Sequence, residues 1–332
     1  MTQFQLGRWI YFLLLAQFLT AQNANAATIT VRIAAPPSLM SLPIYVATER
    51  GFFEKYHVQP QLIECGGDQD CVKALCHGRA DIGVSSELPV MFAAYEENPI
   101  SVLATLVSNK DDLKFLVSRN LLSSGQLSLA GKRIGYVPKS SSHYYMDIFL
   151  LFKGVDPQDV VKVPMTDATA LTQALLYGDV DAVSIWEPEA DKVLQAGGGD
   201  IVKPDAPRLY TQTFNVSVHN QFKYRQKDLV HGIVKALSEA VDYIRKYPSR
   251  AKAAALRNNL ASREFLEKNW HEYTFRMTLQ QSLVTTLQGQ ARWAQREGHI
   301  QSVVSNAPEY LNYIDAMFLR EHKSDHVDFV YR

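Results

Sequence analysis

Four turns in this sequence carry the residue types that hold an anion or a polar oxygen at the start of a helix. Each turn follows an apolar stretch typical of a strand and precedes a helical pattern. The free N–H groups and the positive dipole of a helix N-terminus attract such ligands. Ordinary capping of the helix by the same Ser and Asp side chains is the alternative role. The turns are Pro37-Ser38, Gly66-Gly67-Asp68, Ser85-Ser86 and Ser140 to His143.

A fifth candidate follows another expected strand, at Trp186-Glu187-Pro188. The indole could stack on a flat part of a ligand, and the Glu187 carboxylate could accept from an amine. A packed Trp and a Glu beside a helix dipole are the alternatives. Charged groups of both signs lie near the strand ends, so the charge of the ligand stays open. They are Glu64, Asp68, Glu87, Lys139, His143 and Asp167.

Signatures of catalysis are weak in this chain. His143 and Asp147 are four residues apart on an expected helix, where we predict a surface pair rather than an acid–base dyad. We find neither a G-x-S-x-G nucleophile turn nor a Gly-rich phosphate loop. We therefore expect a binding protein without catalytic residues, cofactor or metal.

The three cysteines, Cys65, Cys71 and Cys76, lie within twelve residues of one another. Cys65 precedes a Gly-Gly turn and Cys71 falls in the first turn of the next helix, so we predict a disulfide between them. Cys76 is then expected to be a free, buried small hydrophobe. A zinc site built from the three cysteines and His77 is the alternative, although structural zinc sites usually add a distant second pair.

The elements that position these turns occur twice. Ala74-Leu75, Gly78 and Asp81 return one hundred residues later as Ala174-Leu175, Gly178 and Asp181. Each copy reads as an amphipathic helix, a glycine stop and a short strand opened by Asp. Alternating strand and helix patterns predict an α/β fold, with mostly parallel sheets and helices on both faces. Ligands bind such sheets at the carboxyl ends of the strands, so two similar lobes would face each other across a cleft.

Composition fits a folded and exported protein. The chain has 332 residues, 47% of them apolar, and a formal net charge of zero, which gives no basic face for nucleic acid. Arg8, the short apolar run from Trp9 to Leu19 and Ala24-Asn25-Ala26 predict a cleavable signal peptide over residues 1–26. The run is too short for a transmembrane helix, which needs about 20 residues.

Several segments together resemble the solute-binding proteins of the nitrate/sulfonate/taurine ABC importers. They are I-Y-V-A-T-E-R-G-F-F-E-K-Y-H-V, G-x-A-D-I-G-V-S-S-E-L-P, G-K-R-I-G-Y-V-P-K-S-S-S-H-Y-Y-M-D, D-A-V-S-I-W-E-P and A-R-W-A-Q-R-E-G. The resemblance implies a two-lobed type II periplasmic-binding fold with added C-terminal helices. Residues 27–112 and 217–332 would form a discontinuous first lobe, and residues 113–216 the second.

Carried over by position, the resemblance implies a set of ligand-facing residues: Ser38, Ser41, Gly66, Gly67, Ser85, Ser86, Ser141, Ser142, His143, Trp186 and Glu187. We expect a monomeric periplasmic receptor that captures a small polar solute, such as a sulfonate, nitrate or taurine, and delivers it to an ABC permease in the inner membrane. Glu87 would disfavour a bare anion. A sensor with the same fold is one alternative. A synthase of the thiamine pyrimidine is the other, although that family's cysteine cluster lies elsewhere in the chain.

Overall fold

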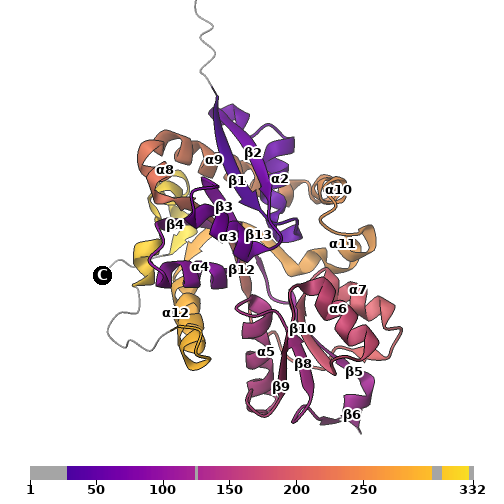
Figure 1. Ribbon diagram of the computed structural model, residues 1–332. Coiled ribbons are helices and arrows are strands. Elements are labelled where there is room, and N and C mark those ends of the chain that lie inside the picture. The colour runs from indigo at the N-terminus through magenta and orange to yellow at the C-terminus, as the bar shows by residue number, and fades with distance from the viewer. Residues whose placement is uncertain (1–27, 124–125, 301–308, 329–332) are drawn as a thin grey trace, which may run out of the picture.

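The computed structural model describes residues 28–123, 126–300 and 309–328, which fold into two lobes, each built on its own sheet (Figure 1). The expected signal peptide, residues 1–26, lies outside the described residues. Within them, no helix combines the length and the apolar character needed to cross a membrane.

The sheet of the first lobe has seven strands in the order β14-β13-β4-β12-β3-β1-β2. In chain order these strands are β1 (Ile29–Ala35), β2 (Val58–Glu64), β3 (Ile82–Ser85), β4 (Ile100–Asn109), β12 (Gln212–His219), β13 (Tyr273–Gln280) and β14 (Val327–Asp328). The sheet of the second lobe has the order β11-β5-β10-β8-β9. Its strands are β5 (Leu113–Ser118), β8 (Arg133–Tyr136), β9 (Val161–Pro164), β10 (Ala182–Trp186) and β11 (Ile201–Val202). A small ribbon pairs β6 (Leu122–Ser123) with β7 (Gln126–Leu127).

Both sheets are mixed, so the expectation of mostly parallel sheets holds for only part of each. Strands β2, β1 and β3 run parallel, as do β9, β8 and β10. In contrast, β12 is antiparallel to both β3 and β4, and β5 is antiparallel to β10 and β11. Parallel neighbouring strands are joined by a crossover within their own sheet. Strands β4 and β12 are not joined in this way: the chain leaves the first sheet after β4 and returns to it at β12.

The chain passes between the lobes twice. It leaves the first sheet after Asn109 and enters the second at Leu113, then returns between Val202 and Gln212. All of β12 pairs within the seven-stranded sheet, and the expected boundary between residues 216 and 217 falls inside this strand. The segment 203–211 is therefore the second connection, and it lies between the lobes.

Helices cover both faces of each sheet because alternate strand residues point to opposite sides. In β5, Phe115 and Val117 pack with Tyr145, Met146 and Phe149 of α5, whereas Leu116 packs with α6 and α7. The helices are α2 (Leu42–Glu49), α3 (Asp68–Cys76), α4 (Glu87–Tyr95), α5 (Ser141–Phe152), α6 (Ala168–Tyr177), α7 (Glu189–Ala196), α8 (Asn220–Arg225), α9 (Lys227–Lys246), α10 (Pro248–Arg257), α11 (Arg263–Asn269), α12 (Gln281–Arg296) and α13 (Met317–His322).

The C-terminal helices belong to the first lobe. Apolar residues of α9, α10, α12 and α13 share one core with β1, β3, β4 and β12. Helix α12 also reaches from this lobe toward α5 of the second (Figure 1), where the Trp293 indole donates to Asp147 at 2.8 Å.

The repeated sequence motif builds the same structure in each lobe. Gly78 and Gly178 follow the ends of α3 and α6 with φ of 66° and 77°, a left-handed conformation that favours glycine. The carboxylate of Asp81 accepts from the Arg32 backbone N–H and is paired with the Arg32 guanidinium at 2.7 Å. Asp181 accepts from Arg133 in the same two ways, with an ion pair of 2.9 Å. Each Asp thus ties its own strand to the neighbouring parallel strand.

Candidate solute-binding cleft

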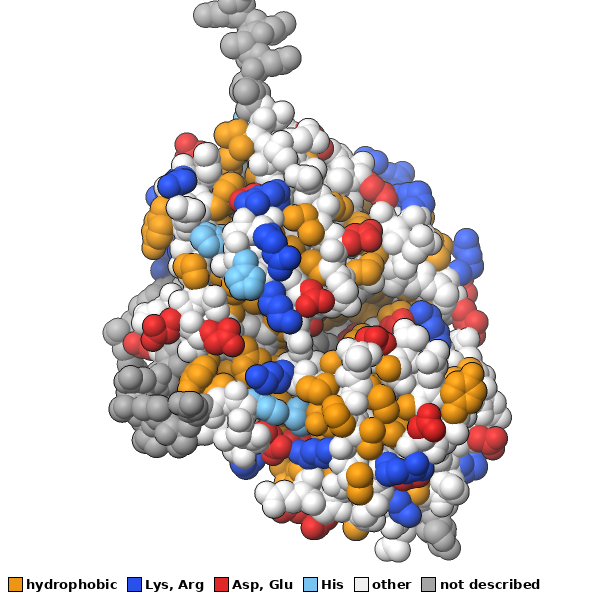
Figure 2. Space-filling view, viewed as in Figure 1, with side chains coloured by type: hydrophobic (Ala, Val, Ile, Leu, Met, Phe, Trp, Pro, Cys, Tyr) orange, Lys and Arg blue, Asp and Glu red, His pale blue; other side chains and the backbone are white. Residues whose placement is uncertain are grey.

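Polar groups at the strand ends of the two lobes meet across the space between them, which Figure 2 shows as a hollow in the surface. Ser86 follows β3 and Ser141 begins α5, and their hydroxyl oxygens lie 3.2 Å apart. The amide of Gln212, the first residue of β12, donates to Ser141 Oγ at 2.9 Å. At the rim, the Gln69 amide donates to the carbonyl of Lys139 at 2.6 Å. The lobes are therefore closed on each other.

Asp68 ends this chain of hydrogen bonds. Its carboxylate accepts from the backbone N–H of Ser86 at 3.2 Å and also from the Ser86 hydroxyl. The alternative role of Asp68, capping of α3, is not observed, because the N-cap is Gly67 and Asp68 already lies in the helix. Since Ser86 donates to Asp68, Ser141 donates to Ser86 and accepts from Gln212. The donors all point toward one acid, whose pKa burial raises.

Glu87, the first residue of α4, is a second buried acid of the cleft. Its carboxylate accepts from the Thr213 backbone N–H at 2.7 Å and from the Tyr210 hydroxyl at 2.8 Å. Tyr210 in turn accepts from the Gln290 amide at 3.1 Å. Burial raises the pKa of Glu87 to about 7, against its ordinary 4.5, because none of these partners carries a positive charge.

A further pair of acids lies where the chain enters the second lobe. Burial and the nearby Glu187 raise the pKa of Asp112 to about 7. Burial also raises the pKa of Glu187, whose carboxylate accepts from the Asp191 N–H at 2.9 Å. The ammonium of Lys114 lies 3.6 Å from Glu187 but also 2.7 Å from Asp111, which Lys203 contacts as well, at 3.3 Å. The three acids Asp111, Asp112 and Glu187 thus face two ammonium groups.

The remaining predicted residues occupy several environments. Ser41 is fully buried and its hydroxyl makes no hydrogen bond within the described structure, whereas Ser38 accepts from the N–H of Met40. Ser85 donates to the carbonyl of Ser86 at 3.0 Å. Trp186 packs against both cores of the second lobe. Gly66 and Gly67 form the turn before α3.

Ser142 lies beside Ser141 but faces its own lobe. Its hydroxyl donates to the Ser184 carbonyl at 2.6 Å and accepts from the Val137 N–H at 3.3 Å. These bonds fix the start of α5 against β10 and the loop after β8. The three consecutive residues Ser141 to His143 therefore point in different directions, and only the Ser141 hydroxyl touches Ser86 of the other lobe.

His143 turns toward α12 instead. Its ring packs on Tyr136 and lies edge-on to Trp293, and its Nδ1 is 3.3 Å from Nε2 of His299. Burial lowers the pKa of His143 to about 3. The expectation of a surface pair with Asp147 is wrong, because His143 is 2% and Asp147 1% exposed. Helix α12 covers both side chains. The spacing of the two residues on α5 cannot predict this burial, because it depends on a helix distant in sequence.

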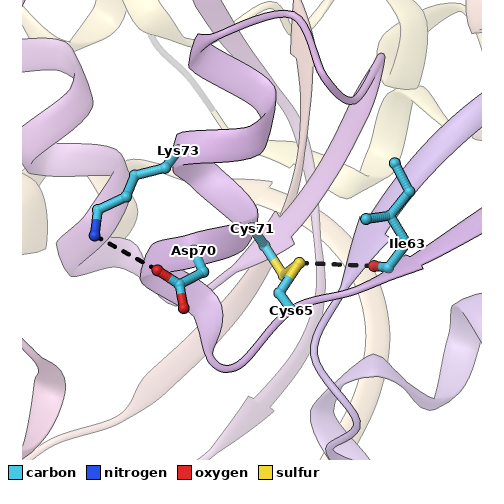
Figure 3. The surroundings of a disulfide bond; sticks show 5 residues. All are labelled: Ile63, Cys65, Asp70, Cys71 and Lys73. Atoms are coloured by element: carbon cyan, nitrogen blue, oxygen red, sulfur yellow. Dashed lines mark hydrogen bonds and ion pairs between the residues drawn. A yellow bond between two sulfur atoms is a disulfide. The ribbon is translucent and has the colours of Figure 1, made fainter. Parts of the chain in front are cut away.

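Cys65 and Cys71 are joined by a disulfide that closes the turn between β2 and α3 (Figure 3). Their Cα atoms are 5.4 Å apart. Cys76 is free but half-buried, which differs from the expected full burial. It lines a pocket of about 400 Å³ between α3, α4 and the turn at 138–139. None of the eleven residues implied by the resemblance lines this pocket. The pocket therefore lies beside the strand ends at which Ser86 and Ser141 meet, and not between them.

Tyr210 and Gln212 are cleft residues that the sequence analysis missed. Both lie in or directly after the connection between the lobes, at 203–211, which has no periodic pattern to place it. The alternation of apolar and polar residues from Phe214 to Val218 is typical of a strand, and it offered a signal. A strand that returns to the first sheet must pass its strand-end edge, so polar residues just before it belong to the cleft.

A profile of the family described as NMT1/THI5 like matches residues 39–251. The chain belongs to this family. It is 24% identical to a putative aliphatic sulfonates-binding protein of Escherichia coli, over 60% of this chain and 63% of that protein. It is 23% identical to the 4-amino-5-hydroxymethyl-2-methylpyrimidine phosphate synthase of Candida albicans, over 64% of this chain and 66% of that enzyme. The matched region thus spans just under two thirds of these curated relatives.

Solved structures confirm the periplasmic-binding fold. The aliphatic sulphonate binding protein SsuA of Escherichia coli superposes with a TM-score of 0.72 at 17% identity, covering 86% of this chain and 92% of that one. The nitrate-binding protein NrtA of Synechocystis gives a TM-score of 0.64 at 12% identity, covering 90% and 89%. The resemblance noted in the sequence therefore holds for family and fold.

Proposed function

We propose that this protein is a receptor that closes its two lobes on a small polar solute. The observation that carries the proposal is the contact of strand-end groups from both lobes, Gln212 to Ser141 to Ser86 to Asp68. Each hydroxyl in this row can exchange its cross-lobe partner for a ligand atom when the lobes part. Two lobes joined by two connections can open as a hinge to admit the solute.

The charges of the cleft support a solute rich in hydrogen-bond donors, neutral or cationic, rather than a bare anion. Asp68, Glu87, Asp112 and Glu187 are acids whose pKa values burial raises. Among the described residues, the Lys114 ammonium is the cation paired with this group, and it is shared with Asp111. A buried anion would add to this repulsion, whereas an amine or amidine would relieve it.

The biological setting follows from the predicted leader at residues 1–26 and from the family. We propose export to the periplasm and delivery of the solute to an ABC permease. The alternative is a sensor protein whose closed form binds a signalling partner such as a receptor kinase. Binding of the closed protein to a permease, and not to such a partner, distinguishes the two roles.

An enzymatic role is the second candidate function, because some relatives are named as pyrimidine phosphate synthases. We favour binding without conversion, because the described cleft groups engage one another through hydrogen bonds, and the Ser86 hydroxyl that donates to Asp68 also contacts Ser141 of the other lobe. Mass spectrometry of the solute after incubation with pure protein tests this directly. Recovery of altered solute would overturn the proposal of a receptor.

The experiment that tests the receptor is a thermal-shift screen of the protein without residues 1–26. The panel contrasts amines, amidines and aminopyrimidines with alkanesulfonates, nitrate and taurine. At one hundred times Kd a solute adds about 2.7 kcal/mol, enough to raise Tm by several degrees. We expect stabilisation by donor-rich solutes. Stabilisation by nitrate or a simple sulfonate alone would contradict the charge argument while leaving the receptor in place.

A further inference from the structure

Three potential metal ligands from both lobes converge beside the cleft. A ring nitrogen of His143, a carboxylate oxygen of Asp147 and one of Glu297 lie within 4.8 Å of one another. His143 and Asp147 are one turn apart on α5 of the second lobe, whereas Glu297 follows α12 of the first. An imidazole with two carboxylates is a donor set that suits Zn²⁺ and its first-row neighbours.

The histidine supplies an observation independent of the acids. His143 is 2% exposed, and its Nε2 is buried without a hydrogen-bond partner among the described residues. A buried polar nitrogen left unpaired is costly, and native proteins rarely keep one. A metal ion is a partner that would satisfy it, because the other ring nitrogen, Nδ1, already faces His299 Nε2 at 3.3 Å.

The surroundings already hold the carboxylates in place for a cation. Trp293 donates to Asp147 Oδ2 at 2.8 Å, which leaves Oδ1 to the ammonium of Lys162. The ammonium of Lys162, on β9, lies 3.2 Å from this Oδ1 and 2.7 Å from Glu297 Oε2. Lys162 is partly exposed, so its flexible side chain can swing to solvent and give up the position to another cation.

We propose that His143, Asp147 and Glu297 bind a divalent transition-metal ion, Zn²⁺ in the first instance, in exchange for the Lys162 ammonium. Because the ligands come from α5 and α12, the bound ion would tie the two lobes together. The site is separate from the row of Ser86 and Ser141, so binding of the ion needs no solute.

The test is calorimetric titration of chelator-treated protein without residues 1–26, using Zn²⁺, with Co²⁺ absorption as a second readout. We expect one ion per chain and visible Co²⁺ bands of a four- or five-coordinate site. Asp147→Asn keeps the acceptor for Trp293, and Glu297→Gln changes a partly exposed residue, so folded variants are expected. Each should weaken Zn²⁺ binding at least tenfold, as should His143→Gln. Lys162→Met removes the competing ammonium and should tighten it several-fold.

The control is His322→Gln with His326→Gln, which removes a second pair of histidines near the C-terminus and should leave the affinity unchanged. Absence of Zn²⁺ binding by the unaltered protein would overturn the proposal. So would loss of binding in the control rather than in the Asp147 and Glu297 variants. Weaker binding by Lys162→Met would refute the exchange. All these results are independent of whether the thermal-shift screen finds a solute.

Discussion

At the scale of single residues, the buried acids of the cleft make the free protein sensitive to pH. The folded protein holds a proton on Glu87 up to about pH 7, whereas the unfolded chain releases it near the ordinary 4.5. A raised pKa of an acid gives stability that is complete below the unfolded value and lost as pH rises through the folded value. Asp112 acts in the same window.

We therefore predict that the free energy of unfolding falls between pH 5 and pH 8, and falls less in Glu87→Gln. The difference between the two proteins should change by about 2–3 kcal/mol over this range, the equivalent of the pKa shift. Urea unfolding at the two pH values measures it. The exposed control Glu267→Gln should follow the unaltered protein, and equal pH slopes for Glu87→Gln would show that Glu87 is ionised throughout.

Neighbouring serines at the start of α5 should behave differently on truncation. Ser142→Ala leaves the Ser184 carbonyl and the Val137 N–H without their partner, which costs about 1–3 kcal/mol of stability. Ser141→Ala removes a cross-lobe hydroxyl and should weaken solute binding about three- to tenfold, with little change in Tm. Calorimetric titration beside melting curves separates the effects, and the reverse pattern would move the ligand contact to Ser142.

At the scale of elements, the turn between β2 and α3 depends on the disulfide. Cys65 and Cys71 are six residues apart, so the chain-entropy model gives roughly 2 kcal/mol for this short loop. We predict that Cys65→Ser with Cys71→Ser loses about this amount, whereas Cys76→Ser loses less. Because burial raises the pKa of Cys76 to about 11, its thiol should react slowly in the native protein. Three rapidly reacting thiols in unreduced protein would contradict the bridge.

Elements with local signals were predictable from sequence, and elements set by long-range pairing were not. The glycine stops at Gly78 and Gly178 and the cap at Asp167 are local, and the structure has all three. The antiparallel pairing of β12 with β3 and β4 joins segments more than one hundred residues apart, which no periodicity encodes. Helix α12 buries His143 and Asp147 through contacts that are likewise distant in sequence. The local pattern on α5 therefore predicts both residues at the surface.

At the scale of the whole molecule, the polar contacts between the lobes stabilise the closed form, so breaking one of them should shift its population. One of them is the ion pair between Lys268, on α11 of the first lobe, and the buried Asp191 of α7, at 2.7 Å. The ammonium is largely exposed, and such pairs contribute about 0.2–1 kcal/mol. Opening the lobes breaks this pair, whereas the pair of Lys192 with Glu189 lies within α7 and is unaffected.

We predict that Lys268→Glu opens the free protein and weakens solute binding, because it places a negative charge beside Asp191 in the closed form only. Loss of the attraction alone corresponds to a factor of about two to five in Kd, and the added repulsion increases it. Small-angle scattering should show a larger radius of gyration without solute and a return to the compact value at saturation. Lys192→Glu makes the same change of charge within one lobe and should alter neither quantity. If both variants weaken binding equally, net charge rather than closure controls affinity, and the hinge would need to be sought in other contacts between the lobes.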